Sequence, residues 1–171
     1  MRVDCIVMAG GKATRMGGVV KPLLDVCGVP MIVRVVRSIS GACRGTYVVY
    51  SKWTKALEDL CSGVLESVVC VEGGGEGYVE DLKMALNLVS LPTLVVPADI
   101  PFLNSAILED FIVKAMLKPE PIVNLSTEKG LTGISLFKQT EGPWADVIIK
   151  RSTPLIDVDT WDDYREAIEK C

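Results

Sequence analysis

The stretch VMAGGKATRMGGVVKP, residues 7–22, decides how the rest of the chain is interpreted. It begins inside an apolar, β-branched run, Val3–Met8, which has the composition of a buried parallel strand. The glycines after this run let the backbone turn tightly and bring its amide groups close to a bound anion. We therefore expect a strand that leads into an anion-binding loop. A solvated turn is the competing interpretation.

Two cationic side chains favour the anion-binding loop. Arg15 can bind phosphate oxygens in a bidentate manner, and Lys21 adds a mobile point charge. The loop matches neither of two common phosphate-binding motifs: Ala13 follows Lys12, so G-K-[ST] is absent, and the glycines are not spaced as G-x-G-x-x-G. A P-loop kinase and a dinucleotide-dependent oxidoreductase are therefore disfavoured.

The composition indicates one globular unit. The chain has 171 residues, of which 49% are hydrophobic, so we expect a single domain over residues 1–171, with enough apolar surface to leave room for a homodimer. The formal net charge is −4, which argues against a nucleic-acid partner, because such proteins usually carry a basic face. No apolar stretch is long enough to predict a membrane span.

The chain contains six cysteines and no histidine. The cysteines are scattered, without a C-x-x-C pair, so we expect free thiols in a reducing cytoplasm. Without histidine, the chain lacks the commonest general base and the commonest transition-metal ligand. Asparagine and glutamine are scarce, which is weakly indicative of a hot environment.

Strand-like and helix-like segments alternate along the first two thirds of the chain. This alternation predicts an α/β fold in three layers, Rossmann-like, with helices on both faces of a mostly parallel sheet. The expected strands are 3–8, 46–50, 67–71 and 93–97, and the expected helices are 31–39, 53–61, 78–89 (with Val79 among the inward residues) and 105–116.

The pattern loosens after Lys118, where prolines and glycines punctuate the sequence. We expect strands at 121–125, 133–137 and 153–159. Thr160, with Asp163 three residues later, predicts a capped final helix whose residues Trp161, Tyr164 and Ile168 face inward.

Carboxylates follow two of the expected strands. Asp99 comes directly after strand 93–97, where the carboxyl ends of parallel strands open onto a ligand crevice, so it can hold Mg²⁺ against phosphate oxygens. It could instead cap the turn ADIP. Asp157 and Asp159 alternate along strand 153–159 and so point the same way. Asp157 is the preferred second metal ligand, because Asp159 could instead cap the final helix.

Residues 8–32, MAGGKATRMGGVVKPLLDVCGVPMI, resemble the signature of nucleotidyltransferases with a glycosyltransferase-A-like fold, a superfamily that includes the molybdenum cofactor and sugar-phosphate nucleotidyltransferases. Three further segments resemble the archaeal adenosylcobinamide-phosphate guanylyltransferases: GEGYVEDL (75–82), LVVPADIPFL (94–103) and IDVDTWDDY (156–164). The resemblance implies transfer of GMP from GTP to adenosylcobinamide phosphate in coenzyme B12 biosynthesis, with release of pyrophosphate. Acceptors such as molybdopterin or a sugar phosphate remain open, as does a non-catalytic nucleotide-binding role.

The resemblance implies that Gly10, Gly11, Arg15 and Lys21 hold the triphosphate of GTP, and the positions and chemistry of other residues add the remaining expected site members. Arg15, Lys21 and Asp99 are the expected catalytic residues, with Mg²⁺ on Asp99 and Asp157. The GTP-binding residues are expected to be Ala9, Gly10, Gly11, Lys12, Thr14, Arg15, Lys21, Gly75, Gly77, Glu80 and Asp81. Glu80 or Asp81 could accept hydrogen bonds from guanine, although acids in a first helical turn also simply complement the helix dipole.

Overall fold

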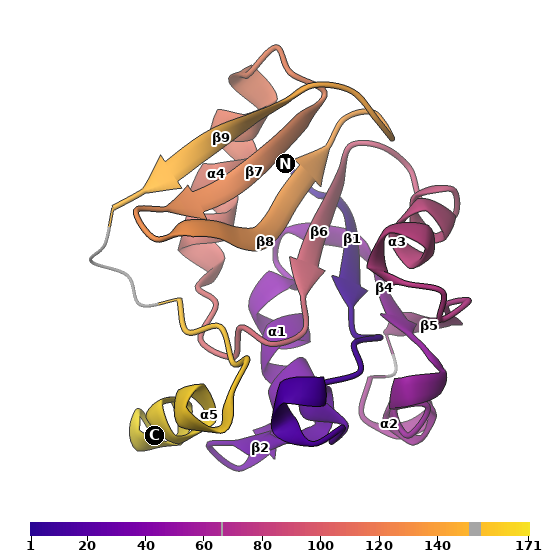
Figure 1. Cartoon of the computed structure of the whole chain (residues 1–171). Helices are drawn as coiled ribbons and strands as arrows, with labels where there is room; N and C mark the ends of the chain where they lie inside the picture. Colours follow the sequence, from indigo (N-terminus) through magenta and orange to yellow (C-terminus); the bar gives the residue numbers. More distant parts are fainter. Residues whose placement is uncertain (66, 151–154) are drawn as a thin grey trace.

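The computed structural model describes residues 1–65, 67–150 and 155–171 (Figure 1). Within them, seven strands form one sheet in the order β5-β4-β1-β6-β8-β7-β9. Only β8 runs antiparallel to its neighbours, so the predicted mostly parallel sheet is confirmed. The strands are β1 (Val3–Met8), β4 (Cys43–Tyr50), β5 (Val68–Glu72), β6 (Thr93–Pro97), β7 (Ile122–Thr127), β8 (Gly130–Phe137) and β9 (Trp144–Ile149).

Helices cover both faces of this sheet, as the sequence predicts. The larger core lies on the face covered by α1 (Met31–Ile39), α2 (Leu57–Gly63) and α4 (Ser105–Leu117). The other face packs against α3 (Tyr78–Leu86), where Ala85 and Leu86 are buried with Ile6 and Val95 of the sheet. Val79 was expected on the inner face of this helix but is exposed, so that expectation is wrong.

A third, smaller core lies outside the sheet. It joins the loop after β1, the hairpin of β2 (Asp25–Val26) and β3 (Val29–Pro30), the start of α1, and α5 (Trp161–Glu169). Its buried members are Met16, Val26, Met31, Ile156, Val158 and Ala167. In Figure 1 this assembly lies below the carboxyl ends of β1 and β6. It places residues 155–159 next to the loop after β1.

The last third of the chain departs furthest from the sequence prediction. Residues 155–159 form no strand, and residues 153–154 lie outside the described residues. The strand that does complete this edge is β9, which pairs in parallel with β7 and was not predicted. The capping box of Thr160 and Asp163 is confirmed, but Trp161 and Ile168 are exposed, because α5 buries chiefly Ala167 against the third core.

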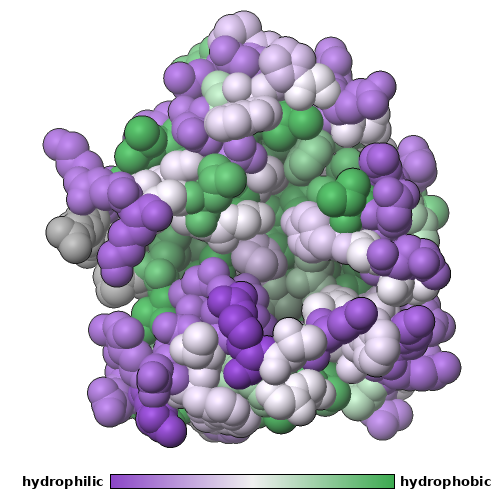
Figure 2. All heavy atoms as spheres, in the orientation of Figure 1, coloured by the Kyte–Doolittle hydropathy of each residue, from purple (hydrophilic) through white to green (hydrophobic). Residues whose placement is uncertain are grey.

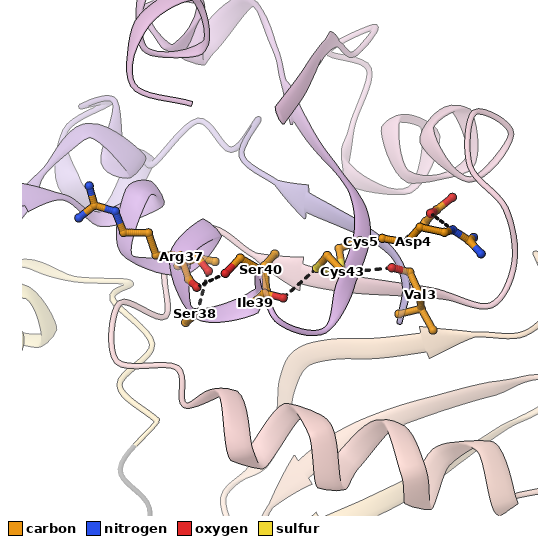
Figure 3. The surroundings of a disulfide bond; sticks show 10 residues. Val3, Asp4, Cys5, Arg37, Ser38, Ile39, Ser40 and Cys43 are labelled. Atoms are coloured by element: carbon orange, nitrogen blue, oxygen red, sulfur yellow. Dashed lines mark hydrogen bonds and ion pairs between the residues drawn. A yellow bond between two sulfur atoms is a disulfide. The ribbon is translucent and has the colours of Figure 1, made fainter. Parts of the chain in front are cut away.

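All six cysteines are joined in disulfides, so the expectation of free thiols is wrong. The pairs are Cys5–Cys43, Cys27–Cys171 and Cys61–Cys70. Figure 3 shows Cys5–Cys43 between neighbouring strands in the main core. The scattered spacing concealed the pairs because each joins different elements of the tertiary structure. No helix among the described residues is long and apolar enough to cross a membrane.

Candidate active site

A cavity of about 290 Å³ opens where β1 and β6 end. The strand order switches direction at this point, because β4 and β5 lie on one side of β1 and β6 lies on the other. Open parallel sheets bind ligands at such a switch point. Figure 2 shows this face of the molecule hollowed near its centre, with strongly hydrophilic residues below the hollow. The lining residues come from the loop after β1, the start of α3 and the end of β6, together with Pro22 and Trp53. They are Met8–Lys12, Pro22, Trp53, Gly75, Gly77, Tyr78, Asp81 and Pro97–Asp99.

The loop after β1 is fixed against β4 by Ser51. The buried Ser51 hydroxyl donates a hydrogen bond to the Gly10 carbonyl (2.7 Å). A Cβ atom at Gly10 would approach the Ser51 Cβ to 3.2 Å, so a side chain at position 10 would force the loop to shift. Gly10 therefore allows a close contact between the two segments, and the Ser51 hydrogen bond holds the loop at the cavity.

Trp53 is a lining residue that the sequence reasoning missed. The Lys12 ammonium lies 4.7 Å from the centre of its ring and that of Lys52 lies 5.1 Å from it, which are cation–π distances. Tyr78 at the start of α3 was also missed. Each aromatic residue follows shortly after a strand of the parallel sheet, and that position was the signal available in the sequence.

The glycine segment 73–77 is held by the buried side chain of Asp81. Its Oδ1 accepts a hydrogen bond from the Gly75 amide (3.2 Å). A Cβ at Gly73 would come within 2.5 Å of the Asp81 carboxyl carbon, so only glycine fits there. Asp81 therefore both shapes this loop and lines the cavity. Glu80 points elsewhere: it is exposed, outside the lining, and 3.9 Å from Lys83.

Lys21, Asp99, Asp159 and Arg15 form a chain of ion pairs, called the ion-pair cluster below. Lys21 Nζ lies 2.6 Å from Asp99 Oδ2 and 3.2 Å from Asp159 Oδ1. Arg15 Nη2 lies 3.1 Å from Asp159 Oδ2. The Lys21 side chain is only 15% exposed, whereas that of Arg15 is 66% exposed. Asp99, which ends the cavity lining, joins the cluster to the cavity.

The charges in this cluster shift two pKa values. Burial by itself lowers the pKa of Lys21, but the charges and hydrogen bonds of Asp99 and Asp159 outweigh burial and raise it, so Lys21 is firmly cationic. Desolvation, followed by the negative charges of Asp99 and Asp159, raises the pKa of Asp157 to about 7. The carboxylate of Asp157 therefore lies close to those of Asp99 and Asp159, and the positive charge of Lys21 is not enough to balance all three.

This donor set fits a hard divalent cation. One carboxylate oxygen from each of Asp99, Asp157 and Asp159 lies within 4.8 Å of the other two. Magnesium and manganese prefer such oxygen ligands, completed by substrate oxygens and water. The sequence left open that Asp99 caps the turn ADIP, but its side chain pairs with Lys21 instead. It also left open that Asp159 caps the final helix, but Thr160 is the residue that caps α5.

Most of the predicted site residues come together, but not all of them. The cavity lining contains Ala9, Gly10, Gly11, Lys12, Gly75, Gly77, Asp81 and Asp99. Arg15, Lys21 and Asp157 belong to or adjoin the ion-pair cluster. Thr14 is exposed in the short 3₁₀ turn Thr14–Met16, and neither it nor Glu80 reaches the cavity lining.

The fold and the site together define a class: an α/β nucleotide-binding enzyme with a glycine loop, cationic side chains and a carboxylate cluster around one cavity. Residues 5–149 match the family described as MobA-like NTP transferase domain. The chain belongs to this family and is a nucleotidyltransferase.

Three relatives illustrate the range of the similarity. The chain is 29% identical over 187 residues to the adenosylcobinamide-phosphate guanylyltransferase of Methanocaldococcus jannaschii, covering 96% of this chain and 95% of that protein. It is 30% identical over 112 residues to a probable molybdenum cofactor guanylyltransferase of Natronomonas pharaonis, covering 64% of this chain and 55% of that protein. Rv0371c of Mycobacterium tuberculosis, solved in complex with manganese, shares the fold with a TM-score of 0.76 at 18% identity, covering 100% of both chains.

Proposed function

We propose that this chain transfers GMP from GTP to adenosylcobinamide phosphate, releasing pyrophosphate and forming adenosylcobinamide-GDP in coenzyme B12 biosynthesis. The observation that carries the transfer reaction is the ion-pair cluster, which places Lys21 and Arg15 beside Asp99 at the end of the cavity lining. The choice of acceptor is supported by the near full-length similarity to the Methanocaldococcus protein. Transfer to molybdopterin is the second candidate, supported by the shorter match to the Natronomonas protein.

The reaction needs no general base from the protein. The second pKa of a phosphate monoester is about 6, so its oxygen is already ionised at neutral pH. That oxygen attacks the α-phosphorus of GTP, the new phosphoanhydride bond forms, and the bond to the β-phosphate oxygen breaks to release pyrophosphate. This chemistry is compatible with a chain that contains no histidine.

Catalysis then depends on alignment and on neutralising the phosphate charges. The amides of Gly10 and Gly11 and the side chain of Lys12 bind the triphosphate, with Lys21 at the α-phosphate. Asp99, Asp157 and Asp159 would hold Mg²⁺, which supplies positive charge to the phosphate oxygens. Lys21 and Arg15 lie beside these carboxylates and would contact the phosphate oxygens.

The guanine base is assigned to the glycine segment 73–77. Glycines let the backbone approach a flat base closely, and Asp81 presents a buried carboxylate at the cavity wall. Its Oδ1 is occupied by the Gly75 amide, so Oδ2 is the oxygen left to accept from the N1–H and N2–H₂ groups of guanine. The reaction is assigned to the cytoplasm, where its nucleotide substrate is made. Disulfide-rich cytoplasmic proteins are typical of hyperthermophiles, in line with the scarcity of asparagine and glutamine.

The decisive experiment measures pyrophosphate release with each of the four nucleoside triphosphates. Each is tested alone, with adenosylcobinamide phosphate, with molybdopterin, and with glucose 1-phosphate. We expect release only with GTP, and only when adenosylcobinamide phosphate is present. Release with molybdopterin instead would transfer the proposal to the second candidate. GTP binding with no release under any condition would favour a non-catalytic nucleotide-binding role.

A further inference from the structure

The hairpin β2–β3 and helix α5 are joined by a disulfide outside the cavity. Cys27 occupies the turn of the hairpin, with a φ of 55°, and Cys171 follows α5. The Tyr164 hydroxyl of α5 donates a hydrogen bond to the Asp25 carbonyl at 2.6 Å, on the same hairpin. Ala167 of α5 is fully buried in the third core. Two kinds of bond and a hydrophobic contact therefore fasten this helix to one small hairpin.

The segment that carries Asp157 and Asp159 depends on the same core. Ile156 and Val158 are buried there, which turns the alternating residues Asp157 and Asp159 toward Asp99. Residues 155–159 form no strand, so no ladder of backbone hydrogen bonds fixes their register. Among the residues that the structure describes, one backbone bond ties the segment to the sheet half of the site, from the Val158 amide to the Asp99 carbonyl (2.9 Å). The ion pairs of Asp159 with Lys21 and Arg15 and the packing of α5 supply further restraint.

The three disulfides differ in accessibility. Cys27 and Cys171 are both exposed, Cys61 and Cys70 are half-buried, and Cys5 and Cys43 lie in the main core. A reductant in solution therefore reaches Cys27–Cys171 first. In Figure 1, α5 lies at the lower left and the helix and strand joined by Cys61–Cys70, α2 and β5, lie at the right. That second disulfide is consequently a control far from the carboxylates.

We propose that the Cys27–Cys171 disulfide is a reducible positioning link for the divalent-cation site, which holds α5 on the hairpin and so keeps Asp157 and Asp159 beside Asp99. This inference rests on the metal role given to these carboxylates in the proposed function. Reduction by a dithiol breaks the S–S bond in two exchange steps. The dithiol gives two electrons and two protons to the two cysteines, becomes a disulfide itself, and frees the end of α5.

The test measures Mn²⁺ binding directly, by the electron paramagnetic resonance signal of free Mn²⁺, without nucleotide. Three proteins are compared: the native disulfide-bonded chain, the double variant Cys27→Ser/Cys171→Ser, and the control double variant Cys61→Ser/Cys70→Ser. We expect the dissociation constant for Mn²⁺ to rise about tenfold in the first variant, the size typical of losing a residue that orients metal ligands. In the control it should change by less than about twofold, because distant sites act independently.

Thermal unfolding of the same proteins separates positioning from general stability. Both variants are expected to unfold at a lower temperature than the native chain, but only Cys27→Ser/Cys171→Ser should bind Mn²⁺ more weakly when both are folded. An unchanged Mn²⁺ affinity in that variant overturns the inference, and so does an equal loss in both variants. Failure of the native protein to bind Mn²⁺ contradicts the metal site of the proposed function as well.

Brief treatment of the native protein with dithiothreitol gives a second measurement without any substitution. Thiol labelling and mass spectrometry should find Cys27 and Cys171 reduced before the other four cysteines. The Mn²⁺ dissociation constant should rise in step with that reduction and recover on reoxidation. Loss of affinity only after Cys5–Cys43 or Cys61–Cys70 is reduced would contradict the proposed link.

Discussion

Lys21 is the residue on which the two halves of the site converge. Its ammonium group contacts Asp99 and Asp159, which are 78 and 138 residues away in the sequence, and its side chain is largely buried. The neighbouring Arg15 is far more exposed and contacts Asp159 alone in the ion-pair cluster. A buried cation between two carboxylates is fixed in position before substrate binds, which lowers the cost of reorganisation during the reaction.

We predict that Lys21→Ala lowers the turnover of GTP by about 10²–10³-fold, because a positioned charge on the α-phosphate is lost in the transition state. GTP binding should weaken only a few-fold, since the glycine loop and Lys12 remain. Steady-state pyrophosphate release and equilibrium GTP binding measure the two effects. The matched control is Lys83→Ala, which removes an exposed lysine on α3. Turnover of Lys21→Ala close to that of the control would show that Lys21 is not catalytic.

Asp81 and Glu80 offer a comparison between adjacent acids. Asp81 is buried at the cavity wall, whereas Glu80 is exposed outside it. Asp81→Asn should reduce kcat/KM for GTP by about tenfold or more, because a hydrogen bond to a charged acceptor is worth roughly 1.5–3 kcal/mol. Glu80→Gln should leave it unchanged. Kinetics with GTP and ATP check both variants, and equal losses in the two would remove Asp81 from base recognition.

At the scale of elements, the connection between β5 and α3 depends on a glycine that contacts a carboxylate. Replacing Gly73 with alanine would push a methyl group to within 2.5 Å of the buried Asp81 side chain. We expect Gly73→Ala to destabilise the protein by about 1–3 kcal/mol, the usual cost of overpacking. Gly63→Ala on α2, where no atom lies within 4 Å, should be neutral or stabilising. Urea unfolding measures both, and equal stabilities would contradict the predicted clash.

The contact between β4 and α2 gives a pH-dependent stability. The Tyr50 hydroxyl donates a hydrogen bond to Glu58 Oε1 (2.7 Å), and this bond raises the pKa of Tyr50 to about 12. The native state therefore keeps its phenolic proton when the unfolded state, with a pKa near 10, has lost it. The stabilisation is complete below pH 10 and is lost as the pH rises toward 12.

Urea unfolding at several pH values from 9 to 12 tests this prediction. The stability difference between the native chain and Tyr50→Phe should be constant up to about pH 10 and shrink above it, since only the native chain has this phenol to titrate. The other tyrosines contribute equally to both proteins and cancel in the difference. A difference that stays constant, or grows, between pH 10 and 12 would be contrary to the prediction.

At the scale of the whole molecule, we propose that residues 1–171 form a single domain, in which the three hydrophobic cores unfold together. The third core shares Met31 with the helix α1 that covers the main core, and Cys27–Cys171 closes 144 residues of chain. We expect one cooperative thermal transition for the disulfide-bonded protein, with equal calorimetric and van't Hoff enthalpies. Two separate transitions would show that the third core and α5 unfold independently.

The disulfides should stabilise the molecule unequally. Cross-linking restricts the unfolded chain more when the closed loop is longer, and the separations are 144 residues for Cys27–Cys171 and 9 for Cys61–Cys70. On this basis, removing the first pair should cost about 2.5 kcal/mol more than removing the second. Guanidinium unfolding of the two double-serine variants provides the comparison. A larger loss for Cys61–Cys70 would mean that strain or residual structure outweighs loop length.

Features set by neighbours along the chain could be predicted. Strand β1 has the bounds expected from its apolar run, α1 lies where its periodicity places it, and Thr160 and Asp163 form the expected capping box. The glycine loop could be located because glycine content and cationic residues are local properties. Each of these depends on hydrogen bonds or periodicities that span only a few residues.

The tertiary structure decided what depends on distant partners. The sequence contained Lys21, Asp99 and Asp159, but only folding brings them within hydrogen-bond distance. It also paired the six cysteines, exposed Trp161, and held residues 155–159 by packing rather than in a strand. Local pattern specifies the segments, whereas the approach of groups far apart in the chain follows from how those segments bury their apolar faces against one another.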